Sequence, residues 1–556
     1  MRTQILITLL TITSILSLFG NNSYPHNWAE NTLATMSADE KIGQLFMVTA
    51  VTDPELNPKW FSNPLVCVEP WYIQDLITRY HIGGIIFLGR GSVEKQNKCI
   101  NQFQQLSSVP LLIGMDYESG LGSVKDNGIR FADAMTLGAT GNPEFTYKIG
   151  KEIGAQCKAT GVHINFGPVV DINNNPDNPV IGFRSFGEDK ENVTRHALAY
   201  IKGLQEQGIL ACAKHFPGHG DTAVDSHLDL PILPFDIQRL CTTELYPFQA
   251  AIKAGVRSIM TAHLYVPAID SDKAHPISLS SDAINGLLRK KMSFNGLVIT
   301  DALIMRAVSD HNAPGQLELK ALLAGNDILL CPTDVPRAVA RIHHALKTGE
   351  LSSTELDEHV LRILQAKEWA FNHCNWNFEV SDEYKHSIDN AYCTTLKKDA
   401  FQASVTAINK IPTLQHNKPI SIIQVGDPKD EDLIENLSHK FKCDVYRLSY
   451  DSTQEEIAHI ATQIAPNTPV IIALFNMTRD PKTKFGISDA ILDLTQKIVT
   501  NESILCIFGS PYCLKYFNKN SAALVAYQND PIAQIVVAEI ITGNYKAPGK
   551  LPVTIS

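Results

Sequence analysis

The sequence lacks the closely spaced cysteine and histidine pairs that build metal cages. Its 11 cysteines are scattered from Cys67 to Cys513 without CxxC or CxH spacing, and their number is odd. Neither a structural zinc site nor a compact disulfide framework is therefore indicated, and most of the cysteines are expected to be buried thiols. We expect no metal and no other cofactor.

The chain also lacks an excess of positive charge. It has 48 lysines and arginines against 58 aspartates and glutamates, which gives a formal net charge of -10 and a pI near 6.0. Such a surface repels the phosphates of nucleic acids and anionic lipid headgroups. We therefore expect no nucleic-acid partner, and a neutral small or polymeric substrate fits the charge better.

The first 20 residues have the pattern of an export signal. Arg2 precedes an apolar run from Ile5 to Phe19, as the charged and apolar regions of a secretory signal do. We predict a signal peptide over residues 1–20 and an exported mature protein, periplasmic or extracellular, without a membrane span. The alternatives are an uncleaved anchor and a cytoplasmic protein with an apolar start.

The 556 residues, 44% of them hydrophobic, are enough for at least two domains. Between residues 40 and 335, eight short apolar runs alternate with helical stretches. Runs without polar alternation suit parallel strands covered on both faces, so we predict a (β/α)₈ TIM-like barrel over residues 30–345. An open doubly wound sheet is the alternative. The predicted strands are 45–48, 84–88, 110–115, 162–166, 210–213, 258–262, 296–300 and 327–331.

A second domain is predicted beyond the barrel. Residues 346–404 predict amphipathic helices that form a linker, and residues 405–556 predict a smaller unit. Apolar runs in that unit alternate with helical stretches, which indicates an α/β/α sandwich. The unit has no GxGxxG or Walker motif. Its predicted strands are 421–425, 470–475, 504–508 and 523–526.

Polar residues follow five of the predicted barrel strands. Barrel enzymes carry their chemistry on the loops at the carboxyl ends of the strands, so we expect these side chains to lie near a shared site. They are Asp116, Asp171, Lys214, His263 and Asp301.

The segment 214–227, KHFPGHGDTAVDSH, is the richest of these strand ends, with one lysine, three histidines and two aspartates. Asp225 and His227 flank Ser226 and could face the same cavity from a loop. A carboxylate beside an imidazole orients the ring and raises its proton affinity, which indicates a general acid/base pair. A metal site built from the three histidines and an ordinary structural loop are the two alternatives.

Asp301 is the other strong candidate, because it ends the apolar strand in VITDAL with only small or apolar neighbours. A carboxylate at the mouth of a barrel is costly to hold without a purpose or a partner. The structural alternative is that Asp301 caps the following helix.

These motifs carry a resemblance to a known family. The segment 214–227 resembles the signature of glycoside hydrolase family 3, in particular its bacterial β-N-acetylglucosaminidase branch. The match continues through MSADEKIGQLFMV, GGIIFLGR, PLLIGMDYESG, NFGPVVDINNNP, FRSFGED, VITDAL, IFGSPYCLKYF and GKLPVTIS, in this order. The β-glucosidases of the same family lack the Asp-Ser-His motif and take their acid from a glutamate elsewhere.

The resemblance implies a retaining mechanism with a glycosyl-enzyme intermediate. In it, Asp301 is the nucleophile, His227 is the acid/base and Asp225 supports the imidazole. A glycosidic oxygen leaves poorly until it is protonated, and the oxocarbenium-like transition state needs a carboxylate beneath the ring. The residues that the resemblance assigns to the sugar hydroxyls are Asp116, Arg184, Lys214 and His215.

The expected activity is release of terminal N-acetylglucosamine from cell-wall muropeptides or glycan fragments. A β-glucosidase or xylosidase of the same family is an alternative. So is a phosphorylase, because a neutral imidazole would not repel an incoming phosphate. A non-catalytic carbohydrate-binding protein and a metal-dependent hydrolase are the alternatives from other classes.

The sequence departs from the family in one sugar-binding stretch. The common DxEGGxVxR reads DYESGLGSVKD, so that Ser119 replaces a glycine and the expected arginine is missing. Lys125 and Arg130 are the candidate substitutes. If His227 is not the acid, Glu118 and Glu188 are the next candidates.

Overall fold

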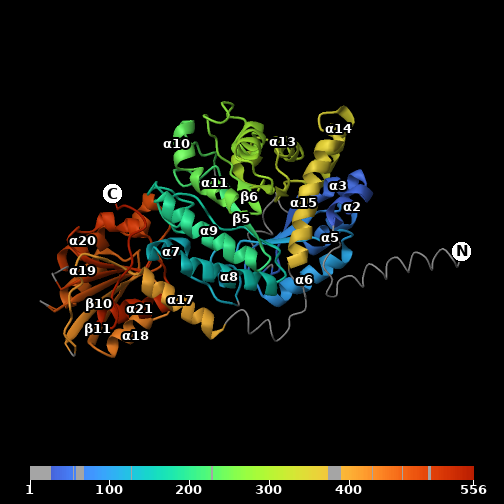
Figure 1. Cartoon of the computed structure of the whole chain (residues 1–556). Helices are drawn as coiled ribbons and strands as arrows, with labels where there is room; N and C mark the ends of the chain where they lie inside the picture. Colours follow the sequence, from blue (N-terminus) through green and yellow to red (C-terminus); the bar gives the residue numbers. More distant parts are fainter. Residues whose placement is uncertain are drawn as a thin grey trace.

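The structure is a computed structural model that describes residues 27–53, 55–57, 68–126, 128–226, 229–373, 390–416, 418–428, 430–465, 468–498 and 502–555. The predicted signal peptide and His227 lie outside the described residues. Figure 1 shows two units, a barrel surrounded by helices and a smaller sheet domain at the C-terminal end of the chain.

Eight parallel strands form the barrel, in the spatial order β7-β6-β5-β4-β3-β2-β1-β8. A parallel bridge between Ile299 and Ile328 joins the first strand of this order to the last. The predicted barrel is therefore confirmed, and the open doubly wound sheet is excluded. The strands are β1 Phe46–Ala50, β2 Gly84–Phe87, β3 Leu112–Met115, β4 Ile164–Asn165, β5 Leu210–Phe216, β6 Ser258–Thr261, β7 Leu297–Thr300 and β8 Leu329–Leu330.

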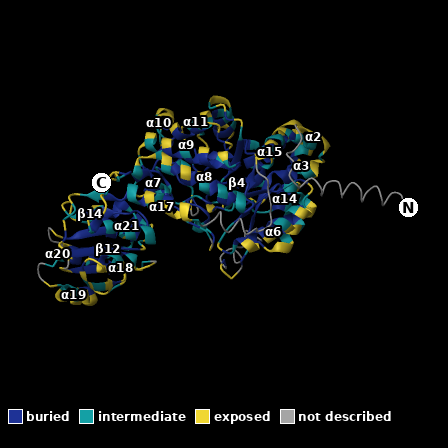
Figure 2. Ribbon diagram, turned by 60° about the horizontal axis from the view of Figure 1, so that its bottom comes forward, coloured by how far each residue is buried: buried dark blue, intermediate teal, exposed yellow. Residues whose placement is uncertain are grey.

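Amphipathic helices cover the outside of the barrel, and their buried faces lie on its strands (Figure 2). In α9 the buried residues Val193, Ala197, Ile201 and Leu204 recur at helical spacing. Gly203 allows α9 to touch α8, because a Cβ there would lie 2.5 Å from the carbonyl oxygen of Tyr147. The principal helices are α2 Trp28–Thr35, α3 Ala38–Gln44, α5 Pro70–Tyr80, α6 Val93–Leu106, α8 Pro143–Ala159, α9 Lys190–Glu206, α10 Ile237–Thr242, α11 Tyr246–Lys253, α13 Gln316–Ala324 and α14 Val335–Thr348.

The stretch predicted as a linker is divided between the two units. Helix α15, Ser353–His373, packs on the barrel helices α2 and α3, and its Glu368 accepts a hydrogen bond from the Trp28 amide at 3.2 Å. Helix α17, Ala391–Ser404, packs on α7, Ala134–Thr140, and α8 of the barrel and on α21, Pro531–Ile541, of the second domain. Residues 374–389 lie outside the described residues.

The C-terminal domain is a six-stranded sheet in the order β11-β10-β12-β13-β14-β9, in which only β9 runs antiparallel. Ile422 packs in one hydrophobic cluster with α21, whereas its neighbour Ile423 packs in another with α20. Adjacent residues of β10 thus face opposite helix layers, as the predicted α/β/α sandwich requires. The elements are β9 Thr406–Ile408, β10 Pro419–Val425, α18 Asp432–Ser438, β11 Lys442–Leu448, α19 Gln454–Gln463, β12 Val470–Leu474, α20 Asp489–Ile498, β13 Ile504–Ile507, β14 Ala522–Val525 and α21 Pro531–Ile541.

The two domains are joined by polar contacts around α7, Ala134–Thr140. The backbone amide of Asp133 donates to Gln528 Oε1 at 2.9 Å, and Asn173 Nδ2 donates to the Tyr512 hydroxyl at 2.9 Å. The carboxyl ends of the second sheet therefore face the carboxyl end of the barrel. Over the described residues, no helix has the length and apolar character needed to cross a membrane.

Candidate active site

Three of the predicted sugar-binding residues meet in one ion-pair network at the carboxyl end of the barrel. Lys214 Nζ lies 2.8 Å from Asp116 Oδ1 and 2.7 Å from Glu118 Oε1. Arg184 forms a bidentate salt bridge with the same Glu118, in which Nη2 donates to Oε1 at 2.6 Å and Nε donates to Oε2 at 3.0 Å. The loops after β3 and β4 and the last residues of β5 thus bring together side chains that lie up to 98 positions apart in the chain.

The network holds Glu118 and Lys214 in their charged forms. Burial alone would raise the pKa of Glu118, but the Arg184 and Lys214 cations outweigh burial and hold that pKa well below its usual range. Burial alone would lower the pKa of Lys214, yet Asp116 and Glu118 leave it raised. A carboxylate held in this way is a poor proton donor at neutral pH. Glu118 is therefore an unsuitable general acid.

Glu188, the other reserve candidate for the acid, lies at the junction of the domains. Its carboxylate accepts a hydrogen bond from the Thr554 amide at 2.9 Å, and its own amide donates to the Pro552 carbonyl. The C-terminal segment uses this carboxylate as an anchor.

His215 is fixed by a buried carboxylate that follows β4. Asp171 Oδ2 lies 2.7 Å from His215 Nδ1, and Asp171 Oδ1 accepts the backbone amides of His215 at 3.1 Å and His219 at 2.7 Å. These bonds orient the His215 ring and the turn after β5. The strand-end pattern pointed to Asp171, but its role as a positioning residue for His215 comes from the structure.

His219 holds the loop that leads toward Asp225. Its Nδ1 lies 2.7 Å from Thr222 Oγ1 and its Nε2 lies 3.1 Å from Ser226 Oγ. Burial and the nearby His215 lower the pKa of His219 to about 4, so the ring is neutral near pH 7.

Both ring nitrogens of His219 are hydrogen-bonded to the Thr222 and Ser226 hydroxyls, which contradicts a metal site that uses His219. In the part of the chain described, no group of three or more His, Cys, Asp or Glu residues could hold a metal ion.

Asp301 lies directly after β7, at the mouth of the barrel and partly exposed. Its amide donates to the Thr261 carbonyl at 2.9 Å, which continues the pairing with β6. The next helix, α12 Arg306–Ser309, has Met305 at its N-cap position, so Asp301 does not cap it. His263 steadies the same turn, because its Nε2 lies 3.1 Å from the Ala302 carbonyl oxygen.

Asp225 and Ser226 are described, whereas their partner His227 is not. Asp225 is partly buried, and its carbonyl accepts a hydrogen bond from the Asp229 amide at 3.1 Å. The bond from Ser226 to His219 ties this stretch to the turn after β5. The Asp225–His227 pair therefore remains a prediction from the sequence.

A cavity of about 350 Å³ opens beside the network, lined by Asp116, Glu118 and Arg184. Lys125 does not line it, because this lysine is 1% exposed and donates to the Gly89 carbonyl at 3.3 Å. Arg130 does line it. Of the two candidates for the missing family arginine, Arg130 is therefore the one placed to contact a ligand.

Two further arginines line the cavity without any sequence pattern that assigns them to the site. Arg90 follows β2, within the family motif GGIIFLGR, and Arg479 comes from the C-terminal domain. Arg479 lies 263 positions beyond the end of β5, by the numbers 479 and 216. Only the packing of the two domains brings it to the barrel, and no local sequence signal indicates this.

A closed (β/α)₈ barrel with charged residues gathered at the carboxyl ends of its strands has the arrangement of a barrel enzyme. Residues 37–366 match the glycosyl hydrolase family 3 N terminal domain, and the chain therefore belongs to this family. It is a glycoside hydrolase. The family resemblance found in the sequence motifs is confirmed.

Relatives of similar length support this membership. β-Hexosaminidase A of Pseudoalteromonas piscicida is 28% identical over 551 residues, which cover 88% of this chain and 91% of the relative. The β-N-acetylglucosaminidase/β-glucosidase of Cellulomonas fimi is 25% identical, with 95% of each chain covered. The structure is similar to that of a family 3 β-N-acetylglucosaminidase from Paenibacillus, with a TM-score of 0.78, 30% identity and coverage of 94% of this chain and 99% of that one.

The Glu118 network gives a first testable prediction. The pKa of Glu118 is depressed in the folded protein, so its contribution to stability is present above the unfolded value of about 4.5 and is lost as pH falls through the folded value. At pH 7, Glu118→Gln should lower the free energy of unfolding by about 2 to 3 kcal/mol, because it leaves the buried Lys214 and the partly buried Arg184 without a full counter-charge.

Chemical denaturation at pH 7 and at successively lower pH values measures this effect. The difference between wild type and Glu118→Gln should shrink below about pH 4.5, where Glu118 begins to bind a proton in the unfolded chain while it stays ionised in the folded protein. Glu191→Gln is the matched control, because this exposed glutamate has only a 3.9 Å pair with Lys190. Equal stability of the two variants at pH 7 would contradict the network's role.

Proposed function

We propose that this protein releases terminal β-linked N-acetylglucosamine from glycans with retention of configuration. The observation that carries the proposal is the placement of Asp301 at the same barrel mouth as the Asp116, Lys214 and Glu118 network. The relatives and the solved structure named above support the sugar specificity, because each name includes β-hexosaminidase or β-N-acetylglucosaminidase, although the Cellulomonas fimi relative is named a β-glucosidase as well.

In the first step, the Asp301 carboxylate attacks C1 of the terminal sugar while the bond to the leaving oxygen breaks. The protonated imidazole of His227 gives its proton to that oxygen, and Asp225 supports the imidazolium. The product is a glycosyl ester of Asp301. In the second step, neutral His227 takes a proton from water, the water oxygen attacks C1, and the ester bond to Asp301 breaks.

The charged network has a separate task in this scheme, which is to hold the sugar. Asp116 accepts hydrogen bonds from hydroxyls, Lys214 and Arg184 donate them, and the His215 imidazole can do either. Because these groups already bond one another, they are oriented before the sugar arrives, and less entropy is lost on binding. Asp171 serves the reaction indirectly, through the orientation of His215.

The place of action belongs to the same proposal. The charged and apolar pattern of residues 1–20 supports export, and an exported enzyme of this specificity would meet cell-wall muropeptides or other glycan fragments. Cell fractionation tests this part, since full-length protein confined to the cytosol would contradict it.

The substrate test compares the p-nitrophenyl β-glycosides of N-acetylglucosamine, glucose and xylose, each with and without phosphate. We expect kcat/KM for the N-acetylglucosaminide to exceed the other two by about 10²-fold or more, because a site built for the acetamido group leaves polar groups unpaired with the others. Free N-acetylglucosamine should be the main product. Preference for glucose or xylose would overturn the proposed specificity, and a sugar phosphate as the main product would make the enzyme a phosphorylase.

A further inference from the structure

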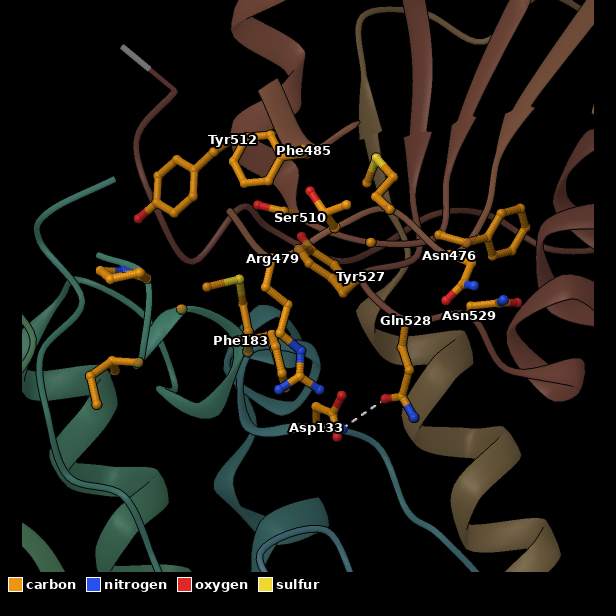
Figure 3. A pocket seen from close by; sticks show the side chains of 18 of the residues that line it. Asp133, Phe183, Asn476, Arg479, Phe485, Ser510, Tyr512, Tyr527, Gln528 and Asn529 are labelled. Atoms are coloured by element: carbon orange, nitrogen blue, oxygen red, sulfur yellow. Dashed lines mark hydrogen bonds between the residues drawn. The ribbon is translucent and has the colours of Figure 1, made fainter. Parts of the chain in front are cut away.

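The loop between β4 and α9 carries Arg184, and the C-terminal domain contacts this loop on both sides of the arginine. On one side, the guanidinium of Arg479 lies 4.3 Å from the centre of the Phe183 ring, and Figure 3 shows these two side chains together at the domain junction. On the other side, Glu188 is bonded to the last residues of the chain. Arg184 itself points to Glu118 of the barrel. The arginine therefore lies between two contacts with the other domain.

The contact at Glu188 is made by the C-terminal segment, which we define as residues 549–554. Both carboxylate oxygens of Glu188 accept hydrogen bonds from Thr554, one from its amide at 2.9 Å and the other from its hydroxyl. The Glu188 amide donates to the Pro552 carbonyl at 2.9 Å. The main chain and the side chain of this loop residue are thus both tied to the segment.

The C-terminal segment is itself fixed to both domains. The Lys550 amide donates to the carbonyl of Ala139 in α7 at 2.9 Å, and the Gly549 amide donates to the Val405 carbonyl, between α17 and β9, at 3.1 Å. Val553 is 3% exposed and packs in a hydrophobic cluster that includes Ala139. Backbone bonds and a buried side chain make the segment a firm support for the loop, unlike a loose chain end.

Gly187 lets the segment approach the loop and passes its position on toward Arg184. A Cβ at Gly187 would lie 2.4 Å from the Pro552 carbonyl oxygen, and its φ of +133° is one that other residues rarely adopt. Its carbonyl accepts the Asn173 amide at 2.9 Å, and its amide donates to Ser185 Oγ at 3.2 Å. Because Ser185 directly follows Arg184, the support reaches the backbone that carries the arginine.

The bonds of Arg184 depend on an accurate position. Its Nη2 and Nε donate to the two oxygens of Glu118 at 2.6 Å and 3.0 Å, and Glu118 Oε1 also lies 2.7 Å from Lys214 Nζ. Such a site works only while its groups stay within about 0.5 Å and 10–20° of the productive geometry. A displaced loop would therefore disturb both cations that are assigned to the sugar hydroxyls.

We propose that Glu188 is a positioning residue for sugar binding. Held by the C-terminal segment, it fixes the loop so that the Arg184 guanidinium meets Glu118 and the hydroxyls of the terminal sugar. Resting on the proposed function, this inference makes the end of the C-terminal domain a supporting part of the N-acetylglucosamine site. Thr554 and Pro552 act on the sugar only through Glu188 and Arg184, and Glu188 takes no part in proton transfer.

Glu188→Ala in the full-length protein tests this role. We expect the inhibition constant of N-acetylglucosamine, a competitive inhibitor, to rise about three- to tenfold, as the loss of one or two hydrogen bonds gives. The kcat for the p-nitrophenyl N-acetylglucosaminide should change less than about twofold, because the contacts of Arg184 serve ground state and transition state alike. The rise stays moderate because Ser185 Oγ still donates to the Asp171 carbonyl at 2.6 Å.

Two variants calibrate this result. Glu188→Gln keeps one acceptor oxygen for Thr554, so it should give an intermediate inhibition constant. Glu191→Ala is the matched control, because this exposed glutamate lies three residues farther along and has only a 3.9 Å pair with Lys190. It should leave the inhibition constant unchanged. Melting temperatures confirm that the variants fold, and Thr554→Ala carries the same test if Glu188→Ala does not.

A double-mutant cycle shows whether Glu188 acts through Arg184. Arg184→Gln alone should weaken N-acetylglucosamine binding, and Glu188→Ala added to it should have little further effect. An unchanged inhibition constant in the folded Glu188→Ala protein would overturn the inference. So would a rise of the same size with and without Arg184→Gln, or a fall in kcat alone. Failure of the proposed function would differ, since wild type would then not hydrolyse the p-nitrophenyl N-acetylglucosaminide at all.

Discussion

Asp301→Asn is expected to lower kcat by about 10⁴-fold or more while the protein stays folded, because an amide cannot form the glycosyl ester. The substitution keeps the size of the side chain. The backbone bond from residue 301 to the Thr261 carbonyl does not involve the side chain, and an asparagine Oδ1 can accept the Ala302 amide as Asp301 Oδ1 does at 2.8 Å, so the turn after β7 should persist. Initial rates with the p-nitrophenyl N-acetylglucosaminide and a melting curve measure the two effects.

The control for this variant is a carboxylate of the same barrel mouth that takes no part in the covalent step. Asp116→Asn removes a charge that Lys214 contacts at 2.8 Å, so it should raise KM and weaken sugar binding. It should not abolish turnover at saturating substrate to the same degree. An Asp301→Asn enzyme with kcat within about tenfold of wild type would rule out covalent catalysis by this residue.

His227→Ala is expected to lose about 10²- to 10⁴-fold in rate on substrates with a sugar leaving group, which must be protonated to depart. The same variant should lose much less glycosylation rate on aryl glycosides with acidic phenols, which leave without a proton. A series of aryl glycosides with different phenol pKa values, compared with N,N′-diacetylchitobiose, measures this dependence.

Asp225→Ala should show a weaker form of the same pattern, because the imidazole remains while its carboxylate partner is lost. A histidine with only a structural role would lower activity equally for every leaving group. Folded variants without any dependence on the leaving group would therefore contradict the assignment. The position of Glu118 in its ion-pair network and that of Glu188 against Thr554 make either residue a poor replacement as the acid.

The barrel was predictable because its strands are buried on both faces and read as continuous apolar runs. Strand β11 was not, because it lies at the edge of the second sheet, where exposed Lys442 and Asp444 interrupt the apolar residues. The antiparallel β9 escaped for a different reason, since three residues are too few for a pattern.

The site was predictable where its residues stand next to one another or directly after a strand. Asp116 and Asp301 directly follow strands β3 and β7, and Lys214 follows the apolar run 210–213, although the observed strand β5 continues to Phe216. Partners supplied by distant segments were not predictable, because hydrogen bonds between loops leave no periodic signal. Three contacts could not be predicted for this reason. They are the ion pair of Glu118 with Arg184, the hydrogen bond of Asp171 to His215, and the contact of Arg479 with the Phe183 ring.

The most direct test of the covalent mechanism is mass spectrometry of the protein after reaction with a slow 5-fluoro N-acetylglucosaminyl fluoride. The fluorine on the ring disfavours the oxocarbenium-like transition state, and the good leaving group lets the first step outrun the second, so the glycosyl ester accumulates. The account predicts one added sugar per chain, on the peptide that contains Asp301. A label on Asp116 or Asp225, or no label on an enzyme that still turns over its substrate, would contradict it.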